Sequence, residues 1–153
     1  MALRSAVALA LLAALLLACA TLPSERDLEE RLERLGASTQ GLRRPRVAAI
    51  QADTRAVAFG LLMEARANRD SPLSQGLSQQ LAAAHLAHRD LVAGGPFGAL
   101  NDRVLCNALA LQQKEEKPLS GLQLLVASPD EPSRALRAAA SKAQVRLLYR
   151  DFR

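Results

Sequence analysis

The sequence predicts a small layered α/β domain with a mainly parallel sheet of three or four strands, preceded by a short N-terminal helix. Three apolar runs are typical of strands buried on both faces: Leu91–Ala93, Leu122–Ala127 and Val145–Tyr149. Between these runs lie segments of ten or more residues with apolar side chains at helical spacing. Strands that alternate with helices form βαβ units, which have right-handed crossovers and a parallel sheet. We therefore expect the three runs to be adjacent parallel strands, with helices on both faces.

The N-terminal helix is expected to begin after Ser24, with Asp27 three residues later in the capping-box position. Its large apolar residues recur at helical spacing: Leu28, Leu32 and Leu35. Gly36 is typical of the residue that ends a helix, and Ala37–Arg46 has the composition of a linker. Because the apolar stripe is only one residue wide, we expect this helix to dock on the domain or to attach loosely.

The segment from Val47 to Asn68 is open to two interpretations. Apolar residues along it follow a helical stripe: Val47, Ile50, Val57, Leu61 and Ala65. Alternatively, Val47–Ile50 is an opening strand and a helix begins near Asp53, which is the interpretation we favour. After a break at Ser71 and Pro72, a second helix is expected over Leu77–His88.

The C-terminal half continues the alternation. The glycine-rich segment Gly94–Gly98 ends one strand and precedes a helix that stops at the Lys114–Pro118 break. One face of that helix is apolar: Leu100, Val104, Ala108 and Leu111. Ser128–Glu131 has the pattern of a capping box with a proline at the first helical position. The helix that follows is expected to turn four residues inward: Leu136, Ala139, Ala140 and Ala143.

The first residues have the pattern of a secretory signal peptide. Arg4 is followed by an unbroken apolar run, Ala6–Ala18, and then by Cys19 and Ala20. Crossing a bilayer takes about 20 apolar residues, so this run is too short for a transmembrane anchor.

The last four residues of this segment, Leu16-Leu17-Ala18-Cys19, resemble the lipobox of bacterial lipoproteins. The resemblance implies that residues 1–18 are removed and that the Cys19 thiol carries diacylglycerol, so the protein is held by its acyl chains in the lipid bilayer. Because Ala20 is not Asp, the resemblance also implies the periplasmic face of the outer membrane in a Gram-negative cell. The alternative is secretion without lipid, by cleavage after Ala20, since Ala18-Cys19-Ala20 has small residues at both ends.

The sequence divides into the signal peptide 1–18, a segment 19–46 with the lipidated cysteine, tether, helix and basic linker, and a single α/β domain over 47–153. Removing residues 1–18, whose only charge is Arg4, lowers the formal net charge from +5 to +4. Basic residues on a membrane-tethered protein fit anionic headgroups. Aromatic residues make up 3% of the chain, with no Trp, so nucleic acid is not an expected partner because stacking platforms need aromatic side chains.

The best candidate site lies where the carboxyl ends of the strands meet. The loop glycines Gly94, Gly95 and Gly98 precede a helix whose free N–H groups are suited to an anion, and Ser128 and Arg150 follow neighbouring strands. The alternative, which we favour, is that the glycines only form a tight turn between strand and helix. No Walker or G-x-G-x-x-G pattern is present.

No pattern indicates catalysis, a cofactor or a metal. His85 and His88 are the only histidines, and a zinc site needs three or four ligands, so we interpret them as residues of a solvated helix end. With Cys19 lipidated, Cys106 has no disulfide partner in the chain. Helical periodicity turns Cys106 towards solvent, whereas free cysteines are commonly buried, so we expect a partly buried and unreactive thiol packed on a neighbouring element such as Leu77–His88.

The sequence thus predicts a membrane-anchored envelope lipoprotein whose domain binds a partner protein or a small ligand in the periplasm without catalysis. The alternative is a periplasmic enzyme or sensor for a small anionic ligand at the Gly94–Gly98 loop.

Overall fold

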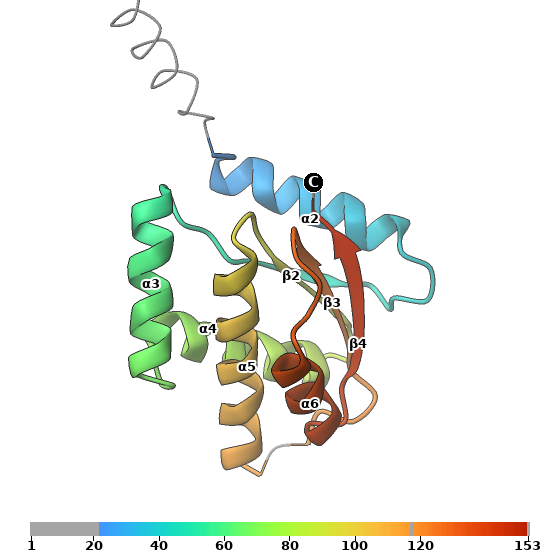
Figure 1. Cartoon of the computed structure of the whole chain (residues 1–153). Helices are drawn as coiled ribbons and strands as arrows, with labels where there is room; N and C mark the ends of the chain where they lie inside the picture. Colours follow the sequence, from blue (N-terminus) through green and yellow to red (C-terminus); the bar gives the residue numbers. More distant parts are fainter. Residues whose placement is uncertain (1–21, 117, 153) are drawn as a thin grey trace, which may run out of the picture.

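Four parallel strands form one sheet in the order β1-β2-β3-β4 in the computed structural model, which describes residues 22–116 and 118–152 (Figure 1). The elements in chain order are α2 (Glu25–Ser38), β1 (Arg46–Ala49), α3 (Arg55–Ala67), α4 (Pro72–Leu86), β2 (Leu91–Gly94), α5 (Gly98–Lys114), β3 (Gln123–Ser128), α6 (Arg134–Lys142) and β4 (Arg146–Asp151). The predicted α/β class is confirmed, and the three predicted strands are adjacent and parallel. The predicted signal peptide and Cys19 lie outside the described residues.

The ambiguous first segment is a strand followed by a helix. β1 pairs with β2 at one edge of the sheet, and α3 begins after Thr54, whose hydroxyl accepts a hydrogen bond from the Val57 N–H at 3.1 Å. α4 starts at Pro72, five residues before the expected start, because proline fits the first helical turn. It ends at Leu86, so His88 lies beyond the helix, with a φ of 53°.

The sequential strand order places the crossover helices on one face. Each strand adds on the same side of its predecessor, so right-handed connections carry every crossover helix to the same face. Burial follows this arrangement along β3: Leu124 and Val126 belong to the large core under α3 to α6, whereas Leu125 and Ala127 belong to a smaller cluster on the other face. Both faces are covered, as expected, but unequally.

The second face is covered by α2, which docks on β1, β2 and β3 (Figure 1). Leu28 and Leu32 are fully buried there together with Phe152 from the chain end. The guanidinium carbon of Arg31 lies 4.4 Å from the centroid of the Phe152 ring, so a cation–π contact joins the two ends of the described chain.

Gly36 does not end α2, contrary to the sequence expectation. The helix continues to Ser38, and Gly36 is buried within it. A Cβ at this position would lie 2.9 Å from the Val92 Cγ2 atom and 3.1 Å from the Pro45 Cγ atom. Gly36 therefore allows the helix to pack closely on the sheet. In the sequence, a glycine with this packing role cannot be told apart from a glycine that ends a helix.

The start of α6 also differs from the expectation. The helix is capped by Ser133, whose hydroxyl accepts from the Leu136 N–H at 3.1 Å, and it does not begin at Ser128–Glu131. A helix from Pro129 would place Pro132 in its second turn, against the carbonyl of Ser128. Pro132 therefore delays the helix by one turn, and Ser128 instead ends β3.

Candidate functional site

Two adjoining shallow grooves lie where the carboxyl ends of the strands meet α3 and the start of α5. The smaller encloses about 270 Å³ and has charged walls formed by Arg66, Asp102, Arg103, Asp130 and Glu131. The larger encloses about 530 Å³ and is mainly apolar, with Leu22, Ala58, Phe59, Pro96, Phe97 and Leu100 in its walls. The two grooves share Leu62, Gly98, Ala99 and Asp130.

The three predicted glycines are each pressed against another part of the chain. A Cβ on Gly94 would overlap the Ala127 carbonyl, and one on Gly95 would overlap the Ile50 carbonyl. A Cβ on Gly98 would overlap the Asp130 carboxylate. Close approach explains all three glycines, and this supports the turn interpretation that the sequence favoured.

Ser128 and Arg150 do not join these glycines in one site. Ser128 is buried, and its hydroxyl is 3.2 Å from the Asn101 Nδ2 donor. Arg150 is exposed on the edge strand β4, two residues after Leu148, which packs on the α2 side of the sheet. Arg150 thus points to the face opposite the grooves, since side chains alternate along a strand. Of the five predicted residues, Gly98 alone lines either groove.

Charge at the start of α5 does not favour an anion. The Asp130 carboxylate lies against Gly98, the first residue of α5, so it places a negative charge beside the first turn of the helix. The small groove also contains three acidic residues against two arginines. The negative charges beside the first turn of α5 therefore oppose the binding of a further anion there.

Ser133 and Asp102 form the closest pair of reactive group types in the small groove. The Ser133 hydroxyl donates to Asp102 Oδ2 at 2.7 Å, and the Ser133 N–H donates to Asp102 Oδ1 at 2.8 Å. The same hydroxyl caps α6 by accepting from Leu136. The Ser133 hydroxyl is held by two structural hydrogen bonds, one donated and one accepted, and neither histidine lines the groove, so this pair joins α6 to α5 and lacks the arrangement of an activated nucleophile.

A buried amide shapes the glycine loop. Asn101, in the first turn of α5, has no exposed surface, and its Nδ2 donates to the Gly95 carbonyl at 2.8 Å. Within the described residues, the Asn101 Oδ1 atom is buried without a hydrogen-bond partner. The glycine loop is thus held by a hydrogen bond from a buried side chain and not by a residue that lines the grooves.

At the opposite end of the sheet, a buried carboxylate joins three segments. Asp90, just before β2, has no exposed side-chain surface. Its Oδ2 accepts from the Arg43 N–H at 2.5 Å, and its Oδ1 accepts from the Arg43 Nη2 and the Gln123 N–H, each at 3.0 Å. Arg43 Nη2 also donates to the Gly121 carbonyl. Burial raises the Asp90 pKa, but the hydrogen bonds from Arg43 and Gln123 and the Arg43 charge outweigh burial, so the pKa lies below its usual value.

Cys106 is partly buried, as expected. Burial, aided by the charge of Asp102, raises its thiol pKa to about 11, which keeps the thiol protonated at neutral pH. Asp102 lies one turn before it on α5 and bonds to Ser133, and Gln113 lies two turns after it and donates to the Ala139 carbonyl. Cys106 therefore lies on the α6 side of α5 and not on the α4 side that we expected.

Two features of the structure were not predicted from the sequence. The Asp90 clamp joins residues far apart in the sequence, and no local pattern marks it. The second feature is an exposed apolar face on α3, where Phe59 is 63% and Met63 46% exposed. Their i,i+4 spacing, on the side of the helix away from Leu61 and Ala65, was the available signal.

Two absences hold for the part of the chain that the structure describes. In residues 22–116 and 118–152, no group of three or more His, Cys, Asp or Glu side chains is placed to hold a metal ion. Within the same residues, none of the helices combines the length and apolar character needed to cross a bilayer. Comparison with protein-family models, with curated proteins and with solved structures finds no match to this chain.

Proposed function

We propose that this protein is a lipoprotein anchored by acylated Cys19 to the periplasmic face of the outer membrane, with an α/β domain that acts as a non-catalytic binding or adaptor module. The observation that carries the proposal is the position of Cys19. It stands at the end of the apolar run Ala6–Ala18, and the described fold begins three residues later, at Leu22. An acylated cysteine at this position would hold the domain directly at the membrane surface.

The polar groups of the domain favour binding over catalysis. Ser133 and Asp102 are engaged in capping α6, Asp90 is closed off by Arg43, and the Cys106 thiol is protonated. A general base or nucleophile needs a free, suitably positioned group. The grooves at the carboxyl ends are open and shallow and do not enclose a small substrate, which favours a contact surface over a catalytic site.

Lipid attachment is tested with a clickable fatty acid fed to cells that produce the full-length chain. We expect label on the wild-type protein and flotation with membranes, with both lost in Cys19→Ser. The matched control is Cys106→Ser, which removes the chain's other cysteine and should keep both label and flotation. A soluble wild-type protein with its N-terminus at Thr21 would contradict the proposal and support simple secretion.

The choice of membrane is tested separately, by density-gradient separation of inner and outer membranes. We expect the wild-type protein in the outer-membrane fraction and Ala20→Asp in the inner-membrane fraction. Equal distribution of both proteins would contradict the predicted location while leaving the anchor intact.

A further inference from the structure

The helix α3 has an apolar face that no other described element covers. Four large apolar side chains are exposed in the described residues, and three of them lie on this helix: Val57, Phe59 and Met63. The fourth, Leu86, ends α4. On the helical wheel Phe59 and Met63 share one side of α3, and the exposed residues Ala56, Gly60 and Ala67 extend this side, whereas Val57 points to the opposite side.

This face is not the one that holds α3 to the protein. Ala58 and Ala65 are buried in the large core, with Leu61 and Leu62 packed at its edge. At about 100° per residue, Ala58, Leu61 and Ala65 point away from both Phe59 and Met63, whereas Leu62 lies at the border between the two faces and lines the large groove together with Phe59. α3 packs mainly on α5 and not on the sheet, so its outer face is the outermost surface of this side of the molecule (Figure 1).

The chain's own N-terminus brings this face near the proposed anchor. Leu22 lines the large groove together with Arg55 and Phe59, and α2 and α3 begin at the same end of the molecule (Figure 1). Cys19 precedes Leu22 by three residues, which span at most about 11 Å when fully extended. Acyl chains on Cys19 would therefore keep the first turns of α3 within reach of the lipid headgroups.

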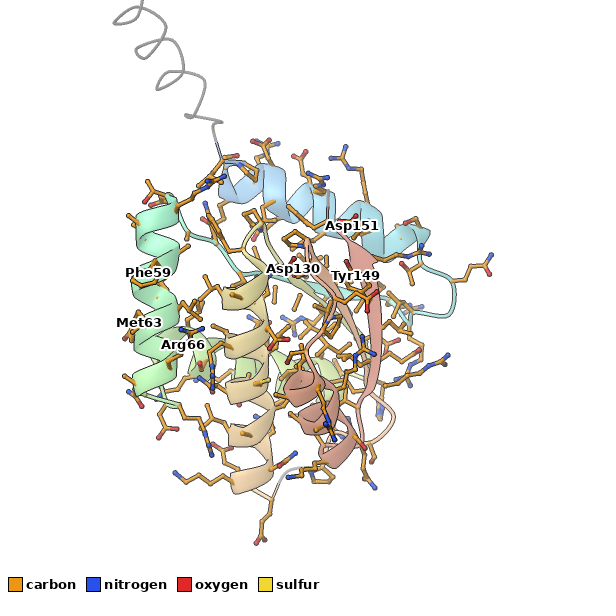
Figure 2. All side chains as sticks on the ribbon, viewed as in Figure 1. Phe59, Met63, Arg66, Asp130, Tyr149 and Asp151 are labelled. Carbon is orange, nitrogen blue, oxygen red and sulfur yellow. The ribbon has the colours of Figure 1, made fainter. Side chains whose placement is uncertain are left out.

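The charges beside the face also fit a lipid surface. Arg55 and Arg66 lie along one side of it, and Arg66 is exposed close to Met63 (Figure 2). Interfacial helices place apolar side chains at the boundary between headgroups and acyl chains, with basic side chains beside the headgroups. Glu64 is the one acidic residue of α3, and it lies away from Phe59 and Met63 on the helical wheel.

We propose that α3 lies along the bilayer surface, with Phe59 and Met63 inserted at the lipid interface, so that the anchored domain has a fixed orientation instead of turning freely on its tether. This inference rests on the proposed lipid anchor. It turns the β4 edge and α6 away from the membrane, where a partner in the periplasm has access to them.

The chain contains no Trp, so one introduced Trp reports on one position. We would place it with Phe59→Trp, and with the matched control Leu86→Trp, which also replaces an exposed apolar residue but lies beside the start of β2 at the other end of the sheet. Each lipidated mature protein, from Cys19 onward, is reconstituted in vesicles of neutral and anionic phospholipids, with and without brominated acyl chains. We expect bromine to quench the Trp of Phe59→Trp about twofold or more and to leave that of Leu86→Trp unchanged.

Flotation of the same vesicles separates the two proposals. Proteins that float while the Trp of Phe59→Trp remains unquenched would overturn the membrane-facing role of α3 and leave the anchor standing. A blue-shifted but unquenched Trp, with cross-links between copies, would overturn it in favour of a second copy of this chain on the same face. Failure to float would refute the anchor and, with it, this inference.

Discussion

α2 and α3 are both short amphipathic helices, but they use their apolar residues in opposite ways. α2 buries its large apolar side chains against the sheet and turns charged residues outward, including the Arg26–Glu30 ion pair. α3 divides its apolar side chains between α5 and the exterior, and Phe59 and Met63 remain exposed. The comparison shows that α3, which has two apolar faces, packs one of them into the core of the domain. The other face is left exposed and is available for contact with a partner or a membrane.

Matched charge substitutions test this comparison most strongly. Leu32→Asp in α2 would bury an unpaired carboxylate at a fully buried site, and we expect it to lower the free energy of unfolding by about 4 kcal/mol or more. Met63→Asp in α3 places the same group at a site that is 46% exposed and should cost about 0.5–1 kcal/mol, mainly through helix propensity. Urea unfolding followed by circular dichroism measures both, and equal losses would refute the distinction.

Arg43, in the segment that follows α2, binds Asp90 and so attaches this segment to the rest of the domain. The substitution Asp90→Ala removes this attachment. The substitution leaves the N–H groups of Arg43 and Gln123 without their acceptor, so we expect a loss of about 3 kcal/mol near neutral pH. Because the folded pKa of Asp90 is lowered, its contribution is fully present above the ordinary carboxyl pKa of about 4 and is lost as pH falls through the folded pKa.

The same unfolding measurement over a pH series checks this assignment. The difference between wild type and Asp90→Ala should be constant from neutral pH down to about pH 5 and should shrink below pH 4. A difference that grows on acidification would contradict the lowered pKa.

Two glycine-to-alanine substitutions test how closely α2 and α3 pack against the elements beneath them. Gly36→Ala places a Cβ 2.9 Å from Val92 Cγ2 in α2's contact with the sheet and should cost about 1–2 kcal/mol. Gly60→Ala on α3 meets no atom within 4 Å and should raise stability by about 0.5–1 kcal/mol, because alanine is the better helix former. Thermal unfolding gives the sign of each, and a gain from Gly36→Ala would show that α2 has room to move.

Thiol labelling of Cys106 tests whether the side of α5 that carries this residue is accessible to solvent. α5 is the helix on which α3 packs. Because the Cys106 pKa is raised to about 11, thiolate is scarce at pH 8, and we expect slow alkylation of the folded protein with Cys19 blocked or replaced. Unfolding in urea should accelerate labelling at least about tenfold. Rapid labelling of the folded protein, or a covalent dimer on a non-reducing gel, would contradict this expectation.

Local patterns predicted most of the elements but only part of the site. Apolar runs were sufficient for β2, β3 and β4, and the Ser24 and Asp27 pair was sufficient for the start of α2, since its cap uses the Ser24 hydroxyl. The glycine loop was correctly placed at the carboxyl ends of the strands. Its chemistry was not predictable, because the Asp130 carboxylate that covers Gly98 comes from a loop more than thirty residues away.

By itself, the sequence determined the α/β class and the parallel sheet, since periodicity is a local property of the chain, and its cleavage pattern is the basis of the proposed lipid anchor. Only the tertiary structure decided the strand order, the placement of α2 alone on the second face, and the role of Gly36 in close packing. It also decided which of the two apolar faces of α3 is buried. These features depend on contacts between distant segments, and such contacts are set by how the layers pack and not by any one segment's pattern of residues.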